Sequence, residues 1–407
     1  ASFVGCNREV KIDDEGNIYL DFWTVYPEGD PGYTWIDSLI KDFEADHPNV
    51  HITHSGMSFW DYFTAIGTSQ TDPSGPDIFM QTSTDNRARA EGLVAMDLSD
   101  YIAEDDTLDP ETDFGARELE ALTSTVNGEE GIFGVPWQTD GRMLYYNADH
   151  VNAMADAVAA DPTLWTNTRA HELGLVGDAP TDLYPADRSA ANGTGGYYDW
   201  TDTDGKNLLD ARGPKTFGEM LAYAELLTVY ANGNKETGAI ERLGFNFDVG
   251  NNSILNFIYN MIDANTGEPG EVFGADGEPD IWHSDDDYND AAYRAYQLWY
   301  EFENLNGRRS DMTSFVSTGT PDGGSAVNLF YTGRASMMIN TNEIPWRNED
   351  LLEDTTVEGG VNLGVCAIPY SELEAAGKAT QRANFSGGYS IEISNVLSDT
   401  ETWDARI

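Results

Sequence analysis

Residues 18–53 have the sequence IYLDFWTVYPEGDPGYTWIDSLIKDFEADHPNVHIT, in which three patterns follow one another. Ile18 to Val25 is an apolar run of β-branched and aromatic residues, typical of a strand, and a Pro- and Gly-rich turn follows it at 27–32. Apolar residues then recur at helical spacing from Trp35 to Phe43, and Pro48 ends that helix. Beyond it, apolar and polar residues alternate over 50–53, as in a strand. A strand, a helix and a strand within about forty residues form a βαβ unit, which predicts a parallel sheet and an α/β fold.

Further strand and helix patterns follow along the chain. A capping box at Thr216 and Glu219 marks the start of one of the helices. We predict strands at 76–80, within 131–147 and at 336–339, helices at 85–93, from 216 to 227 and from about 287 to 304, and a loop-rich segment at 166–213.

The composition is strongly acidic. The 71 Asp and Glu residues against 22 Lys and Arg residues give a formal net charge of −49. Nucleic-acid binders need a basic surface to displace counterions from phosphate, so this charge excludes that class. Acidic excess along the whole chain, with only six lysines, predicts a protein that works in concentrated salt, where screening weakens the repulsion between carboxylates. No apolar run is long enough to span a bilayer.

The two cysteines lie at opposite ends of the chain. Cys366 is in an apolar stretch, as expected of a buried thiol. The segment Ala1 to Cys6 resembles the end of a lipoprotein signal, so Cys6 is a candidate lipid anchor, with a free thiol as the alternative. With scattered histidines and no Cys-x-x-Cys, we expect neither a metal site nor a cofactor.

Signatures of nucleotide-binding, hydrolase and metalloprotease sites are absent from the sequence. Instead, Tyr26, Trp60, Trp137 and Trp346 lie beside turns, at expected strand ends. Ligands of open α/β sheets bind at the carboxyl ends of strands. Flat aromatic faces there can stack on sugar rings while amides and carboxylates bond to hydroxyls, which favours a neutral polyol ligand.

A capping box at Ser398 and Glu401 begins a helix that has Trp403 and Ile407 one turn apart. Two turns are too few for a stable helix, so we expect that the chain continues beyond Ile407.

The ordered set of segments resembles the extracellular solute-binding proteins of carbohydrate ABC importers, the broad family that includes maltose-binding protein. The segments that carry the resemblance, in order, are 22–24, 43–50, 76–78, 91–98, 135–141, 144–147, 213–217, 330–340 and 387–390. Each is a weak signal alone, but their order and spacing extend over nearly the whole chain.

The resemblance implies two α/β lobes, each a mostly parallel sheet flanked by helices, which are joined by a hinge of crossing strands and close around a sugar. By position, residues 1–138 with 389–407 would form the N-lobe and residues 139–388 the C-lobe. The crossing strands would lie near 134–147 and 386–394.

The resemblance also places candidate ligand-binding residues. The N-lobe and hinge candidates are Tyr26 and Trp60 as walls or stacking residues, Ser83, Thr84 and Asp85 as partners of hydroxyls, and Trp137, Asp140, Gly388 and Tyr389 at the crossings. The C-lobe candidates are Asn252, Asn256, Tyr259, Glu343 and Trp346. Core packing is the alternative role for Trp137 and Tyr259. Glu343 stands where relatives often have a stacking tryptophan, and Trp346 lies three residues on, so we expect the sugar platform to be displaced.

The function implied is an extracellular, non-enzymatic and monomeric protein that captures a neutral sugar or oligosaccharide and delivers it to an ABC permease in the membrane. Two alternatives stay open. One is a binding protein for another solute, such as a polyol, a compatible solute or a peptide. The other is a secreted carbohydrate-active hydrolase with an acidic pair near Asp140 and Glu343.

Overall fold

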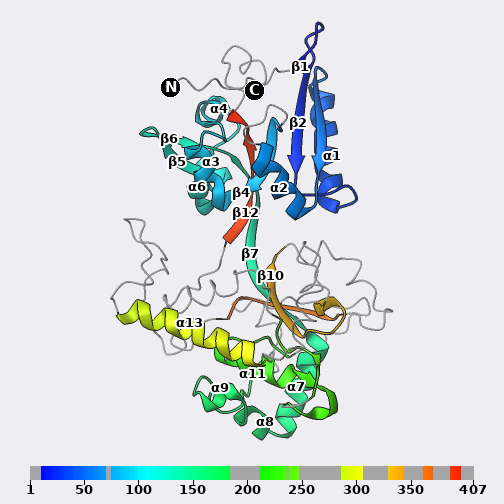
Figure 1. Cartoon of the computed structure of the whole chain (residues 1–407), viewed down its shortest axis with the longest axis vertical. Helices are drawn as coiled ribbons and strands as arrows, with labels where there is room; N and C mark the ends of the chain where they lie inside the picture. Colours follow the sequence, from blue (N-terminus) through cyan, green and yellow to red (C-terminus); the bar gives the residue numbers. More distant parts are fainter. Residues whose placement is uncertain are drawn as a thin grey trace. The chain divides into compact units, whose positions relative to one another are not determined.

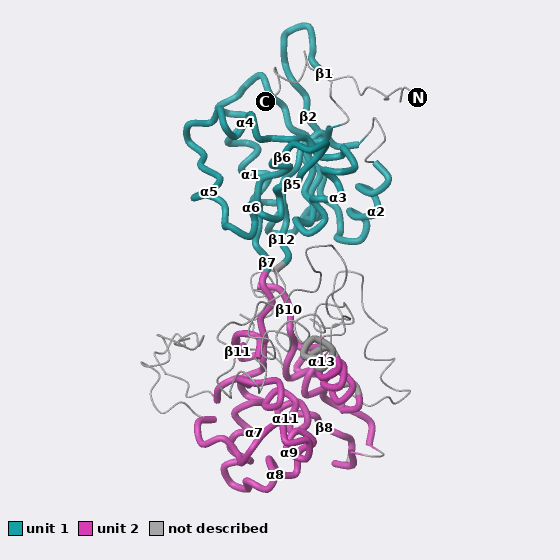
Figure 2. The backbone as a smooth tube through the Cα atoms, turned by 90° about the vertical axis from the view of Figure 1, so that its left-hand side faces the viewer, with its two compact units in different colours: residues 1–140, 386–407 teal, residues 141–385 magenta. Residues whose placement is uncertain are grey.

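The computed structural model describes residues 11–69, 75–183, 211–235, 238–246, 286–305, 329–342, 361–369 and 386–395. The chain forms two compact units, which are coloured separately in Figure 2. Unit 1 contains residues 1–140 and 386–407, and unit 2 contains residues 141–385. The predicted boundaries lie at 138/139 and 388/389, and the assignment of these units as two ligand-closing lobes stays a prediction.

A twisted sheet is the centre of unit 1. It contains β2 (Ile18–Thr24), β3 (Val50–Gly56), β4 (Ile78–Thr82), β12 (Ser386–Ile393) and the first half of β7 (Val135–Asn147). As the βαβ pattern predicts, β2 is parallel to both β3 and β4, whereas β12 is antiparallel to β4 and lies between β4 and β7 (Figure 1). A short strand, β1 (Lys11–Ile12), pairs with the start of β2.

The described part of unit 1 also contains helices and a hairpin. They are α1 (Pro31–Asp46), α2 (Phe59–Ser69), the 3₁₀ turn η1 (Ser83–Asp85), α3 (Asn86–Glu91), α4 (Ser99–Glu104), α5 (Pro110–Asp113), α6 (Ala116–Leu122), β5 (Thr123–Val126) and β6 (Glu129–Ile132). Helix α1 begins where the turn ends: Asp30 accepts a bond from the amide of Gly32 at 2.8 Å, and Pro31 is the first helical residue. Its inner face buries Ile36 and Ile40 against the sheet.

Unit 2 is built around the second half of β7. There β7 pairs antiparallel with β10 (Met337–Thr341) and with β11 (Leu363–Cys366). The described part of unit 2 also contains α7 (Ala148–Ala160), α8 (Thr163–Thr166), α9 (Arg169–Glu172), α11 (Phe217–Leu227), β8 (Val229–Tyr230), the 3₁₀ turn η2 (Ala231–Gly233), β9 (Ile240–Arg242) and α13 (Asp286–Leu305). The core gathers large side chains of several helices, among them Trp165, Phe217 and Tyr223.

The α/β class is confirmed, and the pairing is more mixed than the mostly parallel sheets that we predicted. The βαβ rule covers only consecutive strands joined by a crossover. Strands β10, β11 and β12 come about 200 residues or more after the strands that they pair with. Strands β10 and β11 run antiparallel to β7, and β12 runs antiparallel to β4. No helix among the described residues is long and apolar enough to cross a membrane.

Candidate functional site

The carboxyl ends of β2, β3 and β4 meet at one edge of the unit 1 sheet, because β2 is parallel to both neighbours. Each of these strands is followed by a candidate: Tyr26 after β2, Trp60 after β3, and the loop Ser83–Asp85 after β4. We call this region the unit 1 edge. It has the position at which open α/β sheets bind their ligands.

The side chain of Tyr26 at the unit 1 edge is fixed by a hydrogen bond and by aromatic packing. Its hydroxyl donates to Oε1 of Gln138 at 2.8 Å, and its ring meets the ring of Tyr389 edge-on, with centroids 6.5 Å apart. The ring is only 2 % exposed, since the first turn of α1 packs against it. A Cβ at Gly32 would lie 2.7 Å from Cγ of Tyr26, so this close approach requires glycine. Tyr26 is thus a packing residue in this structure, and its contact with a ligand stays a prediction.

The crossing residues lie close to Tyr26. Tyr389 pairs with Thr82 across β12 and β4, and Gly388, with a φ of +140°, packs against the carbonyl of Gln138. Trp137 is half-buried and contacts Trp35 of α1, with ring centroids 4.9 Å apart. The structure therefore brings Tyr26, Trp137, Gly388 and Tyr389 together from segments far apart in the sequence.

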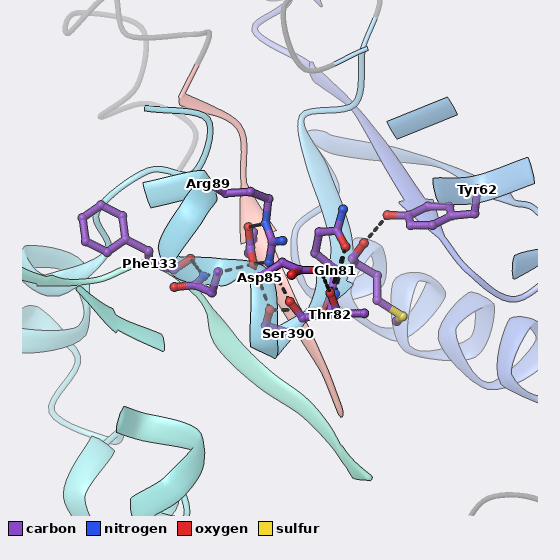
Figure 3. Close-up of polar contacts among 10 residues, drawn as sticks. Tyr62, Gln81, Thr82, Asp85, Arg89, Phe133 and Ser390 are labelled. Carbon is purple, nitrogen blue, oxygen red and sulfur yellow. Dashed lines mark hydrogen bonds and ion pairs between the residues drawn. The ribbon is translucent and has the colours of Figure 1, made fainter. Parts of the chain in front are cut away.

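The loop Ser83–Asp85 forms one 3₁₀ turn directly after β4. The hydroxyl of Thr82 donates to Oδ2 of Asp85 at 2.7 Å (Figure 3). The side chains of Thr84 and Asp85 are exposed. Hydroxyl groups and a carboxylate in this position can donate to and accept from the hydroxyls of a sugar.

Trp60 is the second residue of α2 and is 54 % exposed, in edge-on contact with Phe59 at 5.2 Å between centroids. Asp140, the last residue of the unit 1 part of β7, is half-buried. The candidates Asn252, Asn256, Tyr259, Glu343, Trp346 and Cys6 lie outside the described residues.

The histidine nearest to this edge is uncharged at neutral pH. His54 of β3 stacks on Tyr33 at 4.2 Å between ring centroids, and its Nε2 lies 2.8 Å from the Thr24 hydroxyl. Burial lowers the pKa of His54 below its ordinary value of 6.5. The described part of the chain holds no group of three or more His, Cys, Asp or Glu side chains that could bind a metal ion.

Several residues of this region are not among the candidates that the sequence predicts. Gln138 lies within the stretch that carries the family resemblance, and its polar side chain next to Trp137 was an available signal. In the sequence Trp35 is one apolar member of a helical repeat, yet it is 56 % exposed and contacts Trp137. The buried pair of Arg89 and Glu392 left no sequence signal, because 303 positions separate the two residues.

Solved structures with the same fold have low sequence identity to this chain. A structure of CpMnBP1 with mannotriose bound is 17% identical, covers 96% of this chain and 77% of its own, and gives a TM-score of 0.59. The ABC substrate-binding protein Lmo0181 from Listeria monocytogenes, in complex with cycloalternan, is 18% identical at 95% and 72% coverage, with a TM-score of 0.56. Maltose-bound T. maritima MalE3 is 16% identical at 95% and 75% coverage, with a TM-score of 0.54. At these identities the similarity establishes the fold.

A search of curated proteins gives no match to the chain. The sequence profile described as "Bacterial extracellular solute-binding protein" matches residues 26–256, more than half of the 407 residues. The match begins at Tyr26 and includes the loop Ser83–Asp85 and the crossing residue Trp137. The chain therefore belongs to the bacterial extracellular solute-binding protein family.

Proposed function

We propose that this protein captures a neutral sugar or oligosaccharide outside the cell and delivers it to an ABC permease, without making or breaking a bond. The proposal rests on the side chains that lie at the unit 1 edge of this member of the family. Aromatic side chains at Trp137 and Trp35 lie at the same sheet edge as a loop with the exposed side chains of Thr84 and Asp85. Aromatic faces and hydroxyl-binding groups together suit a sugar, and the neutral His54 adds no charge.

The ligands named for proteins with this fold support the same chemistry. They are cycloalternan, mannotriose, maltose, α-D-tagatose and D-mannitol. Most are neutral sugars and one is a polyol, so polyols belong in the test.

In this proposal the two units act as lobes, with residues 1–138 and 389–407 in one and 139–388 in the other, and the sugar selects the closed state because it contacts both. The protein works as a monomer, and Cys6 is a candidate lipid anchor at the cell surface. The C-lobe residues would come from Asn252, Asn256, Tyr259, Glu343 and Trp346.

A thermal-shift screen in molar KCl tests the proposal against neutral sugars, polyols, amino acids and peptides. A ligand that binds only the folded state raises the unfolding midpoint by mass action. We expect a shift with one class of sugar and recovery of that sugar unchanged. Consumption of the sugar would indicate a hydrolase, and a shift with amino acids or peptides alone would overturn the sugar assignment.

A further inference from the structure

A fully buried ion pair lies directly beneath the loop Ser83–Asp85. Arg89 of α3 is 6 % exposed and Glu392 of β12 is 0 % exposed. The guanidinium Nε donates to Oε2 of Glu392 at 2.7 Å, and Nη2 donates to Oε1, so the pair is bidentate (Figure 3). Residues of two segments 303 positions apart are joined in this way.

Further side chains complete the hydrogen bonding of the Glu392 carboxylate. Asn86 Nδ2 donates to Oε1 at 3.0 Å and to the carbonyl of Phe133 at 2.9 Å. The Ser390 hydroxyl lies 3.0 Å from the same Oε1. We call Arg89, Glu392, Asn86 and Ser390 the buried network. Taking two charges out of water costs so much that a buried pair is often no more stabilising than apolar residues of similar volume. The energy of folding alone therefore does not explain why the network is ionic.

The network contacts the residues on either side of the loop. Arg89 Nη2 donates to the carbonyl of Thr82 at 2.8 Å, and Thr82 is the residue before Ser83. Asn86, which binds Glu392, is the residue after Asp85. On β12, Ser390 and Glu392 follow Tyr389, which is paired with Thr82. The network thus fixes both ends of a loop whose Thr84 and Asp85 side chains are exposed.

We propose that Arg89 and Glu392 are positioning residues that hold the loop Ser83–Asp85 in one conformation and in register with the crossing strand β12. Directional bonds from a guanidinium to a carboxylate and a carbonyl fix this geometry, which apolar side chains of the same size cannot do. The ligand-related part of this inference, that the fixed loop binds sugar more tightly, rests on the function proposed above.

The test uses three variants of the full chain. Glu392→Gln keeps the shape of the side chain but removes its charge. The double variant Arg89→Met/Glu392→Met removes the bonds without leaving an unpaired buried charge, and it carries the test if Glu392→Gln does not fold. Arg87→Gln is the matched control, because Arg87 is on the same helix with its side chain 80 % exposed and paired to Glu91.

Hydrogen exchange of the peptide 82–91 is the first readout, and the Kd for mannotriose by calorimetry is the second. We expect both network variants to exchange at least tenfold faster in 82–91, with β2 and β3 unchanged, and to bind mannotriose at least tenfold more weakly. The control should stay within twofold of the wild type in both readouts.

Wild-type exchange in the double variant would overturn the inference. Exchange that accelerates equally in all of unit 1 would also overturn it, since that indicates a purely structural pair. Faster local exchange with an unchanged Kd would overturn the ligand-related part. If mannotriose does not bind the wild type, that part is tested with whichever solute the thermal-shift screen identifies. If no solute binds, the proposed function fails, and the exchange readout still decides the positioning role.

Discussion

The hydroxyl of Tyr26 is a buried donor whose acceptor, Gln138, lies 112 positions further along the chain. Replacing Tyr26 by Phe removes the donor of this bond, so we expect a loss of about 1 kcal/mol in the free energy of unfolding. Urea unfolding in high salt measures this loss of stability. Tyr19→Phe is the control, because Tyr19 is 41 % exposed and water can replace its bond to Asp13. Equal stability of Tyr26→Phe and the wild type would contradict the assigned bond.

His150 makes unit 2 sensitive to acid. Burial, with a smaller effect of Arg242, lowers its pKa from 6.5 to about 4, and its Nδ1 lies 3.0 Å from the Ser336 hydroxyl. Between pH 6.5 and 4 the unfolded chain binds a proton there that the folded chain does not. The contribution of neutral His150 is therefore fully present above pH 6.5 and is lost as the pH falls toward 4.

We expect His150→Gln to lose less stability than the wild type between pH 7 and pH 4.5, as followed by urea midpoints. Carboxylates also titrate in this range, so the difference between variant and wild type is the relevant quantity. His47→Gln, at an exposed position, controls for the effect of the substitution itself. Parallel slopes for His150→Gln and the wild type would refute the prediction.

Single residues also show what the sequence could not reveal. Its position after β2 places Tyr26 at the unit 1 edge, but the direction of its ring depends on the space left by Gly32. Likewise, spacing predicts that Trp35 and Ile36 share a helix, while only the packed structure shows that Trp35 is exposed beside Trp137. Local pattern predicts position along the chain, and side-chain direction requires the tertiary neighbours.

At the scale of elements, α11 has a helix start that can be tested. The hydroxyl of Thr216 accepts from the amide of Glu219 at 3.1 Å, as the capping box predicts. Thr216→Ala should cost about 1 kcal/mol in the free energy of unfolding, because that amide loses its partner. Ser38→Ala, at an exposed position within α1, should be neutral or slightly stabilising. Thermal unfolding measures the stability of both variants. An equal change in stability for Thr216→Ala and Ser38→Ala would argue against the cap.

Elements with a local signal were predictable. The strands β2, β3 and β4, the helices α1, α11 and α13, and the strand β10 all follow from periodicity, turns or a capping box. Their partners were predictable only where a crossover joins consecutive strands. The position of β12 between β4 and β7 was not predictable, since both of these strands lie hundreds of residues earlier in the chain.

For the whole molecule, the formal charge of −49 leads to a prediction about salt. The screening length is about 8 Å at 0.15 M salt and about 3 Å at 1 M, so repulsion among surface carboxylates weakens strongly in between. We expect the unfolding midpoint to rise markedly from dilute buffer to 2 M KCl. Uncharged sucrose at equal osmolality is the control and should raise the midpoint less. A midpoint independent of KCl concentration would exclude adaptation to salt.

The discontinuity of unit 1 has a consequence for biosynthesis. Its first 140 residues leave the ribosome early, but β12 fills the middle of its sheet and is translated only after all of unit 2. Until then Arg89 has no Glu392 to pair with, and β4 lacks its antiparallel neighbour. Domains usually fold in the order in which they are made. Because the sheet of unit 1 is complete only with β12, we expect unit 2 to be able to fold before unit 1. A chain stalled before residue 386 should therefore expose its N-terminal segment to proteases and chaperones.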